Sequence, residues 1–496
     1  MAEDPKGQRP AGSGRVAFRG MVWTAAALIF SKALSFVSQI ALGYLLAVET
    51  YAIFALLTTA MIFVSGFQNS GVSKALIQQQ ERLDALLPEY SAFALWMGLI
   101  GFVLLIVTGA AFQSLYDVPG LFLIIFVQAL SLPLIAMSTI LMAVLSARLA
   151  FRTLNLIEMR RSLTYYAVLI IGAAVGTAGF TMALALLAGA ILHLTMLART
   201  AAPFHIGFRL SFARFRAMAW QLRWIIISAF LFALGMNGDY LVLGKMLQSQ
   251  DVGYYFFGFM LITNVTILLA SGINQTLLPV FSKLKNDLPA LQRQVLMSSG
   301  AITLMACMLS ICLIGFGAVM VHLIWGGKWD GAIVVVLSVA AIQPVRLTAT
   351  MGGVVLEAQG AWSLRLGTLV FDGALILVCS AVGAWLGGLY GAAIAVAVQR
   401  AATGLITFPM GVRRIGIGWR RIGAFWLRCL GPYFLVVGGL FLLAPDRYAD
   451  ADTWAIVGRA ALETAGALAV FVAANMVFNR ELLGAMAGVI RSRKPA

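Results

Sequence analysis

The stretch Leu-Gly-Tyr-Leu-Leu at positions 42–46, followed by Tyr-Ala at 51–52, is the most informative feature of this chain. The same pattern returns 201 positions later as Leu-Gly-Lys-Met-Leu at 243–247, followed by Val-Gly at 252–253. A second register, offset by 211, relates Pro133 to Pro344. Self-similarity at a fixed spacing indicates an internal duplication, which is how many membrane bundles are built.

The composition excludes an ordinary soluble domain. Of the 496 residues, 61% are hydrophobic and only 11% are charged, and the mean hydropathy is +0.94. These values lie outside the usage of globular proteins. Each membrane span needs about 20 apolar residues, and only helices and closed barrels satisfy their backbones in lipid. Because the apolar runs here are long and continuous, we predict an all-α polytopic membrane protein.

The apolar runs predict about fourteen transmembrane helices. Some of them abut closely, so their boundaries are the least defined part of the prediction. The expected spans are 21–46, 51–73, 89–112, 121–147, 163–180, 181–198, 224–244, 252–278, 295–320, 332–357, 364–385, 388–409, 424–444 and 454–478.

Basic residues are distributed unevenly between the predicted loops. Most of the 35 Lys and Arg residues fall in the two tails and in alternate loops, whereas the opposite loops hold only Lys245, Lys328 and Arg447. Positive charge gathers on the cytoplasmic side of membrane proteins, so both termini should be cytoplasmic. The net charge of +16 then reflects topology and attraction to anionic lipids, and we expect no nucleic-acid partner.

The duplication divides the chain into two lobes. Because each repeat holds an even number of helices, the lobes should be related by an axis along the membrane normal, around a central cavity. The predicted parts are a flexible cytoplasmic tail (1–20), an N-terminal six-helix lobe (21–198), a basic cytoplasmic linker (199–223), a C-terminal six-helix lobe (224–409), two additional transmembrane helices (410–478) and a cytoplasmic tail (479–496).

No motif in the sequence indicates catalysis. A Walker-type loop, a His-Glu-x-x-His pair and a Gly-x-Ser-x-Gly elbow are all missing from the sequence, so we expect a protein that is not an enzyme and has no catalytic residue. The four cysteines fall in or beside spans and predict neither disulfides nor a metal site. We expect no cofactor, with a proton or sodium gradient as the source of energy.

Polar residues form a stripe on the first span. Each ionisable group within a span costs about 2.5 to 3.5 kcal/mol to insert, so such groups are candidates for function. Lys32 lies deep in this span, and other polar side chains recur around it at helical spacing: Ser31, Ser35, Ser38 and Gln39. The stripe must face either neighbouring helices or a water-filled cavity. We predict that Lys32 and Gln39 bind substrate in a cavity.

Two arginines lie within spans of the second lobe. Arg346 follows Pro344, which removes a helix donor and opens the backbone locally. Arg400 follows Gln399 in the twelfth span. A guanidinium binds phosphate oxygens through a fork of two donors and is always charged. We predict that both arginines bind substrate; for Arg346 the alternative is a structural ion pair.

Three further titratable residues lie within spans. Asp239 and Asp372 can bind a cation or proton, or can pair with a basic residue of the cavity. His193 can titrate near neutral pH or can be satisfied by its neighbours. We predict that Asp239, Asp372 and His193 serve ion coupling or a cavity ion pair.

Several stretches resemble the polysaccharide and O-antigen flippases of the multidrug/oligosaccharidyl-lipid/polysaccharide (MOP) exporter superfamily. Ala52 departs from the family, where glycine is usual, but its counterpart Gly253 keeps the pattern. The resemblance implies two six-helix bundles around a central cavity, alternating access and a lipid-linked oligosaccharide as cargo. The stretches lie at 42–54, 237–247, 251–255, 278–284 and 325–332, and the last, Trp-Gly-Gly-Lys-Trp-Asp-Gly-Ala, is the most specific.

We therefore predict a bacterial inner-membrane flippase. It would move undecaprenyl-diphosphate-linked repeat units for exopolysaccharide, capsule or O-antigen assembly, with membrane lipids, a polysaccharide polymerase and a chain-length regulator as partners. One alternative is a cation-coupled multidrug exporter of the same superfamily, whose cavity should be dominated by acids. Another is a membrane-embedded glycan polymerase or ligase, which usually needs a large outer loop that the predicted spans do not leave.

Overall fold

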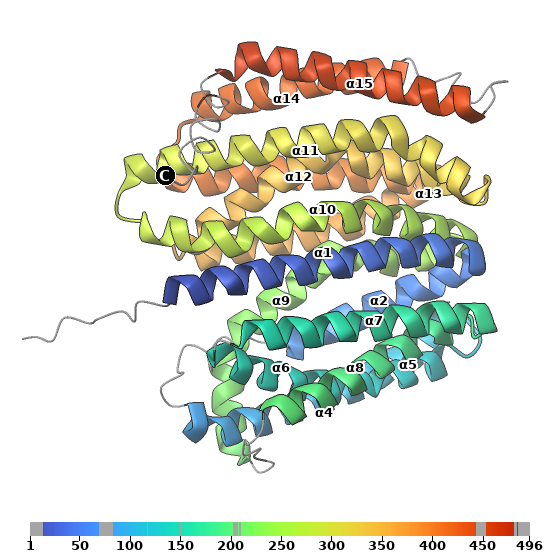
Figure 1. The fold of residues 1–496 in the computed structure, drawn as a ribbon, viewed down its shortest axis with the longest axis vertical. Coiled ribbons are helices and arrows are strands. Elements are labelled where there is room, and N and C mark those ends of the chain that lie inside the picture. The colour runs from blue at the N-terminus through green and yellow to red at the C-terminus, as the bar shows by residue number, and fades with distance from the viewer. Residues whose placement is uncertain are drawn as a thin grey trace, which may run out of the picture. The chain divides into compact units, whose positions relative to one another are not determined.

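The computed structural model describes residues 13–68, 83–116, 118–148, 150–201, 207, 210–442, 453–480 and 484. Every regular element in these ranges is helical, which confirms the all-α prediction (Figure 1). The helices are α1 (Ser13–Leu45), α2 (Val48–Gln68), α4 (Leu83–Tyr116), α5 (Leu121–Ala129), α6 (Ser131–Ala147), α7 (Phe151–Val175), α8 (Phe180–Ala201), α9 (Phe212–Met246), α10 (Ser249–Lys283), α11 (Leu288–Trp325), the 3₁₀ turn η2 (Asp330–Ala332), α12 (Ile333–Ala358), α13 (Trp362–Arg414), α14 (Trp419–Leu442) and α15 (Thr453–Phe478).

Eleven segments of the described chain are helical, long and apolar enough to cross a membrane. One of them, α13, has 53 residues and covers two predicted spans. Its backbone breaks at Gly387 and Gly388, where Gly388 has a φ of 55° that favours glycine. On either side of the break, Gly383 and Gly391 meet backbone to backbone. The two arms of α13 therefore run antiparallel as a hairpin, as two separate spans would.

Several predicted boundaries differ from the structure, because charged and polar residues at the span ends remain helical. Residues 13–20 of the expected flexible tail belong to α1, and residues 1–12 lie outside the described part of the chain. The span expected at 163–180 is α7, which begins at Phe151 and ends before Gly176, a left-handed C-cap. Its first turns carry Glu158 and Arg161, which pair at helical spacing and so support the helix instead of ending it. The basic segment expected at 199–223 is likewise largely helical, since α8 reaches Ala201 and α9 begins at Phe212.

The chain forms two compact units. Unit 1 contains residues 1–46 and 57–233, and unit 2 contains residues 47–56 and 234–496. In unit 1, α7 packs between α1 and α8, and α6 packs against α4 and α8. The core between α4, α6 and α8 includes Phe93, Val144 and Leu197. The first turns of α2 belong to unit 2, and the rest of that helix belongs to unit 1.

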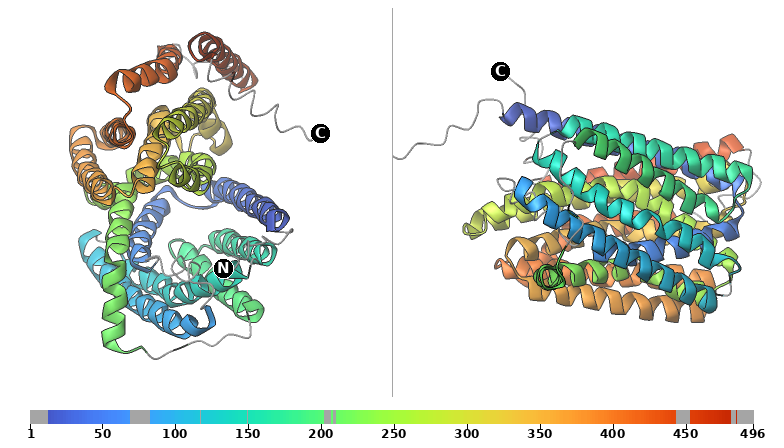
Figure 2. Two further views of the ribbon diagram at one scale, coloured as in Figure 1. Left: turned by 90° about the vertical axis from the view of Figure 1, so that its left-hand side faces the viewer. Right: turned by 90° about the horizontal axis from the view of Figure 1, so that it is seen from below.

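Unit 2 is built around α11, α12 and α13. Gly352 of α12 and Gly411 of α13 face each other so closely that a methyl group on either would strike the other helix's backbone. Such small residues let membrane helices approach and gain van der Waals contact. The C-terminal helices α14 and α15 pack beside each other and against α11 (Figure 2). They are therefore part of unit 2.

The two copies of the repeated pattern meet within unit 2. Gly253, at the start of α10, lies against the carbonyl of Val48 at the start of α2, where a side chain would not fit. Next to this contact, Tyr51 packs edge-on against Trp329 with ring centroids 4.8 Å apart, and Trp329 stacks on Phe257 at 3.9 Å. The Gly-Lys-Trp stretch at 325–332 thus closes a buried aromatic cluster over the glycine of the repeat.

Candidate functional site

A fully buried carboxylate, that of Asp239, lies in a cluster of charged side chains in unit 2. Asp239 of α9 has no exposed surface. The Tyr255 hydroxyl donates a hydrogen bond to Oδ2 at 2.8 Å, and the Tyr240 backbone N–H donates to Oδ1 at 3.2 Å. The Arg400 guanidinium lies 3.6 Å from Oδ2 and supplies the positive charge. A buried carboxylate with these partners is compensated both in charge and in hydrogen bonds.

Arg400 is held by protein groups on several sides. It projects from the second arm of α13 and is only 4% exposed. Besides Asp239, its guanidinium donates to the carbonyls of Gly235 at 3.4 Å and Met236 at 3.2 Å, and it lies 5.0 Å from the Phe259 ring centroid. The geometry is that of a structural ion pair, which is one of the roles that the sequence left open for Asp239, and a substrate-binding role of Arg400 stays a prediction.

Arg346 lies in the same cluster but has different neighbours. Its Nη2 contacts the sulfur of Met236 at 3.2 Å, and its guanidinium lies 5.8 Å from the Phe259 ring centroid. Among the described residues, no carboxylate is within ion-pairing distance of it. A thioether is a weak acceptor. Among the described residues, Arg346 therefore has weaker partners than Arg400.

The helix that carries Arg346 is opened by Pro344. A proline has no N–H, so the carbonyl of Ala340, one turn earlier, loses its helical partner. The Ser310 hydroxyl of α11 donates to this carbonyl at 2.6 Å, and the Tyr433 hydroxyl of α14 donates to the next carbonyl at 2.8 Å. Hydroxyl groups of neighbouring helices thus satisfy the carbonyls of Ala340 and Ala341 and hold α12 in place before Pro344 and Arg346.

Asp372 brings a second carboxylate to the cluster from the first arm of α13. Gln399 of the second arm donates to its Oδ1 at 2.8 Å. On the α9 side the carboxylate abuts Gly235, where a Cβ would lie 3.1 Å from its Cγ and closer still to Oδ2. The cluster therefore has two guanidinium and two carboxylate groups, and Asp239 and Asp372 both attract Arg346 while Arg400 repels it.

In unit 1, the polar face of α1 meets α7. Ser31 hydrogen-bonds Ser162 at 3.1 Å, and Tyr166 hydrogen-bonds Ser35. Gln39 is buried and Lys32 is partly buried on the same helix. The serines thus take the helix-to-helix role that the sequence left open, and a substrate-binding role of Lys32 and Gln39 stays a prediction.

His193 has an acidic neighbour that sequence reasoning missed. Its Nε2 lies 3.6 Å from a carboxylate oxygen of Glu158, which also accepts a hydrogen bond from Arg161 Nε at 3.0 Å. His193 is 7% exposed. Glu158 was overlooked because hydropathy placed residues 151–162 in a loop. The spacing of Glu158 and Arg161, three residues apart, was the available signal for a helix.

Eleven long apolar helical segments, with ionisable side chains buried among the helices, define a multi-pass membrane protein. The lipid II flippase MurJ in its inward closed conformation matches the fold with a TM-score of 0.71 and 13% identity, covering 93% of this chain and 100% of that one. A multidrug resistance MATE family transporter of the MOP superfamily, inward-facing, gives 0.61 and 13%, covering 79% and 94%. These fold neighbours are flippases and transporters, not enzymes.

Sequence comparison assigns the family. Residues 41–334, more than half of the chain, match the family described as polysaccharide biosynthesis protein, and the chain belongs to that family. The teichuronic acid biosynthesis protein TuaB of Bacillus subtilis (strain 168) is 22% identical over 385 residues, which cover 77% of this chain and 76% of TuaB. The chain thus belongs to a family of polysaccharide biosynthesis proteins, and its fold is that of the MurJ and MATE structures.

Proposed function

We propose that this protein is a flippase that moves undecaprenyl-diphosphate-linked oligosaccharide repeat units across the bacterial inner membrane by alternating access. The observation that carries the proposal is the guanidinium of Arg346, which lies beside the buried Arg400–Asp239 pair and has no carboxylate within ion-pairing distance among the described residues. A diphosphate is the anionic group of such a lipid, and its charge must be sheltered on the way through the membrane.

The energetic argument concerns the cost of a charge in the membrane. Each charge near the bilayer centre costs about 2.5 to 3.5 kcal/mol on insertion scales, and more when it stays unpaired. Arg346 would lower this cost for the diphosphate through bidentate hydrogen bonds. Asp239 and Asp372 would weaken the attraction between Arg346 and the diphosphate, so that the cargo is released at the other face of the membrane. We also propose substrate contact for Lys32 and Gln39 of α1, and Arg400 would act by adding positive potential.

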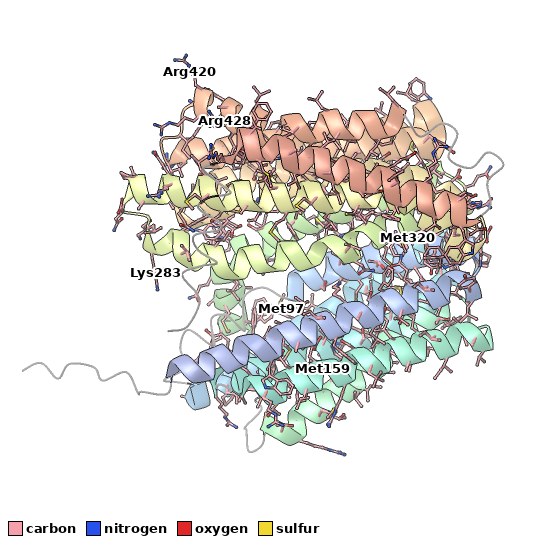
Figure 3. The ribbon with its side chains drawn as sticks, turned by 45° about the horizontal axis from the view of Figure 1, so that its top comes forward. Met97, Met159, Lys283, Met320, Arg420 and Arg428 are labelled. Atoms are coloured by element: carbon pink, nitrogen blue, oxygen red, sulfur yellow. The ribbon has the colours of Figure 1, made fainter. Side chains whose placement is uncertain are left out.

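We further propose fourteen spans with both termini cytoplasmic, in two six-helix lobes followed by two additional helices. The hairpin of α13 supports this count, because it divides one long helix into two spans, and α7 and α10 are long enough to add two more. Figure 3 supports the orientation: Lys283, Arg420 and Arg428 lie at one end of unit 2, and Met320 lies at the other. The basic end would be cytoplasmic.

Ion coupling is the remaining part of the proposal. A proton or sodium gradient would drive transport without a cofactor, and His193 with Glu158 in unit 1 offers a titratable pair for it. Asp239 and Asp372 would be the carboxylates that a coupling cation competes for in unit 2. A polysaccharide polymerase and a chain-length regulator would act on the translocated unit.

Deleting the gene tests the proposed function. We expect loss of one surface or secreted polysaccharide while its lipid-linked unit is still made and accumulates at the cytoplasmic face. Re-expression of the wild-type chain should restore the polysaccharide. A mutant that keeps its polysaccharide and becomes sensitive to cationic dyes would instead support the multidrug exporter.

A further inference from the structure

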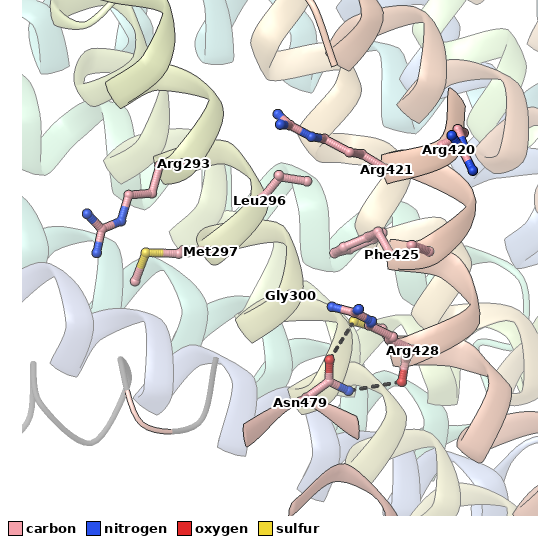
Figure 4. A pocket seen from close by; sticks show the side chains of 11 residues that line it. Arg293, Leu296, Met297, Gly300, Arg420, Arg421, Phe425, Arg428 and Asn479 are labelled. Atoms are coloured by element: carbon pink, nitrogen blue, oxygen red, sulfur yellow. Dashed lines mark hydrogen bonds between the residues drawn. The ribbon is translucent and has the colours of Figure 1, made fainter. Parts of the chain in front are cut away.

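A cavity of about 560 Å³ lies in unit 2, apart from the cluster of Arg346 and Arg400. It is formed by the first half of α11, the first half of α14 and the residue after the end of α15 (Figure 4). Its lining combines four arginines, Arg293, Arg420, Arg421 and Arg428, with an apolar wall. Nothing in the proposed transport cycle uses these residues.

The helical spacing explains how both helices present charge and apolar surface to the same cavity. On α14, Arg421, Phe425 and Arg428 follow at intervals of four and three, and so lie on one face. On α11, Arg293, Met297 and Gly300 repeat this spacing. In Figure 4, Arg421 and Arg428 extend from α14 toward α11, past Phe425. The cavity thus has a cationic part and an apolar part, as an amphiphile requires.

Among the described residues, the arginines of the cavity have no acidic partner. No acidic residue is among those that line it, and within the described part of the chain none of the four forms an ion pair. Arg420 and Arg421 also lie in the first turn of α14, which has no acidic residue. The positive end of the helix dipole disfavours cations there, so a bound anion would relieve the repulsion.

Polar groups close the inner wall behind Arg428. The Asn479 amide donates to the Arg428 carbonyl at 2.9 Å, and Asn475 accepts from the same amide at 2.7 Å. Asn479 is 8% exposed and lines the cavity beside the buried Cys429. These bonds tie the end of α15 to α14, so the cavity has a defined inner wall and is not a loose gap between helices.

We propose that this cavity binds a resident phospholipid whose headgroup carries two phosphates, with Arg421 and Arg428 on the phosphates and acyl chains along Leu296, Met297 and Phe425. The two guanidiniums that reach from α14 toward α11, those of Arg421 and Arg428, match the two phosphates of such a headgroup, and each fork binds a phosphate bidentately. Basic pockets between helices on the cytoplasmic side are suited to such lipids.

The charge balance separates this site from the transport site. Around Arg346, two carboxylates offset two guanidiniums, which suits a cargo that must leave in every cycle. In the α11–α14 cavity no acidic residue of the described chain offsets the arginines, which suits a ligand that stays. The bound lipid would join the C-terminal pair of helices to α11 and so stabilise unit 2.

The test is lipid binding to the purified full-length chain, measured by native mass spectrometry and by the shift of the thermal unfolding midpoint. The probes are cardiolipin with its two phosphates, phosphatidylglycerol with one, neutral phosphatidylethanolamine, inorganic pyrophosphate and undecaprenyl diphosphate. The variant Arg421→Gln/Arg428→Gln removes two charges from the cavity. The control Lys285→Gln/Arg414→Gln removes two exposed charges that do not line it.

We expect cardiolipin to bind most tightly and to raise the unfolding midpoint. The cavity variant should lose at least about tenfold in affinity, as expected when charge-assisted hydrogen bonds are lost, whereas the control should change by less than about twofold. Equal loss in the two variants, or no preference for cardiolipin over phosphatidylglycerol, would overturn the proposal. Pyrophosphate binding as tightly as cardiolipin, or displacement of cardiolipin by undecaprenyl diphosphate, would also overturn it. Because the readout is binding, it does not depend on which cargo is transported.

Discussion

Replacing Asp239 by Asn should strongly destabilise the protein. The substitution keeps the shape of the side chain and still allows Tyr255 to donate a hydrogen bond. It removes the carboxylate that lies 3.6 Å from Arg400, whose side chain is 4% exposed. Among the described residues, the guanidinium then retains two backbone carbonyls and the Phe259 ring. Breaking one side of a buried pair costs about 3 to 5 kcal/mol, and we expect a loss in this range.

The assay is unfolding of the purified protein in detergent, followed by denaturant or heat. A matched control is Glu463→Gln, which breaks the Arg459–Glu463 pair on α15, where the arginine is 51% exposed. That pair should contribute less than about 1 kcal/mol. The double variant Asp239→Asn/Arg400→Gln should recover much of the loss, because neither member of the pair then remains as a buried charge without its partner. The reasoning is refuted if Asp239→Asn costs no more than the control.

Three other substitutions test single contacts by the same unfolding assay. Ser310→Ala should cost about 1 to 3 kcal/mol, because the Ala340 carbonyl freed by Pro344 loses its donor. The control Ser299→Ala changes a buried hydroxyl without a partner among the described residues and should be near neutral. Equal effects of the two variants would contradict the role of Ser310. Gly235→Ala should cost about 1 to 3 kcal/mol, because its methyl group would strike Asp372. The control Gly367→Ala places its methyl group in open space and should cost nothing. A neutral Gly235→Ala would show that Asp372 is free to move. Tyr51→Phe should leave the free energy of unfolding unchanged or raise it, since the buried hydroxyl of Tyr51 has no hydrogen-bond partner in the described structure. A clear loss of stability would contradict this and would indicate a hydrogen-bond partner for the hydroxyl.

The spans were largely predictable because the bilayer imposes a length and an apolar composition on each helix. The repeated pattern was also informative: its glycine at 253 proves to be the point where α10 meets the Val48 carbonyl. The early start of α7 was not predictable from hydropathy. Glu158 and Arg161 lower the apolar average, yet they pair with each other and remain in the helix.

The pairing of charges could not be read from the sequence. Arg346 and Arg400 both follow a polar or helix-breaking residue within an apolar run, and Asp239 and Asp372 both offered a carboxylate. The packing of α9 against α13 decides that Asp239 pairs with Arg400, whereas Arg346 contacts the sulfur of Met236. From the sequence, the arginines of the α11–α14 cavity indicate only which loops are cytoplasmic. That they line one cavity depends on how helices distant in the sequence pack.

The most direct test of the central claim is polysaccharide production by a deletion strain that expresses Arg346→Ala. The account predicts a chain that inserts at near-normal levels but does not restore the polysaccharide, because the anion contact is lost while the Arg400–Asp239 pair remains. Arg346→Lys should restore it only in part, since an ammonium lacks the bidentate fork. Full restoration by Arg346→Ala at normal expression would contradict the claim that Arg346 binds the diphosphate.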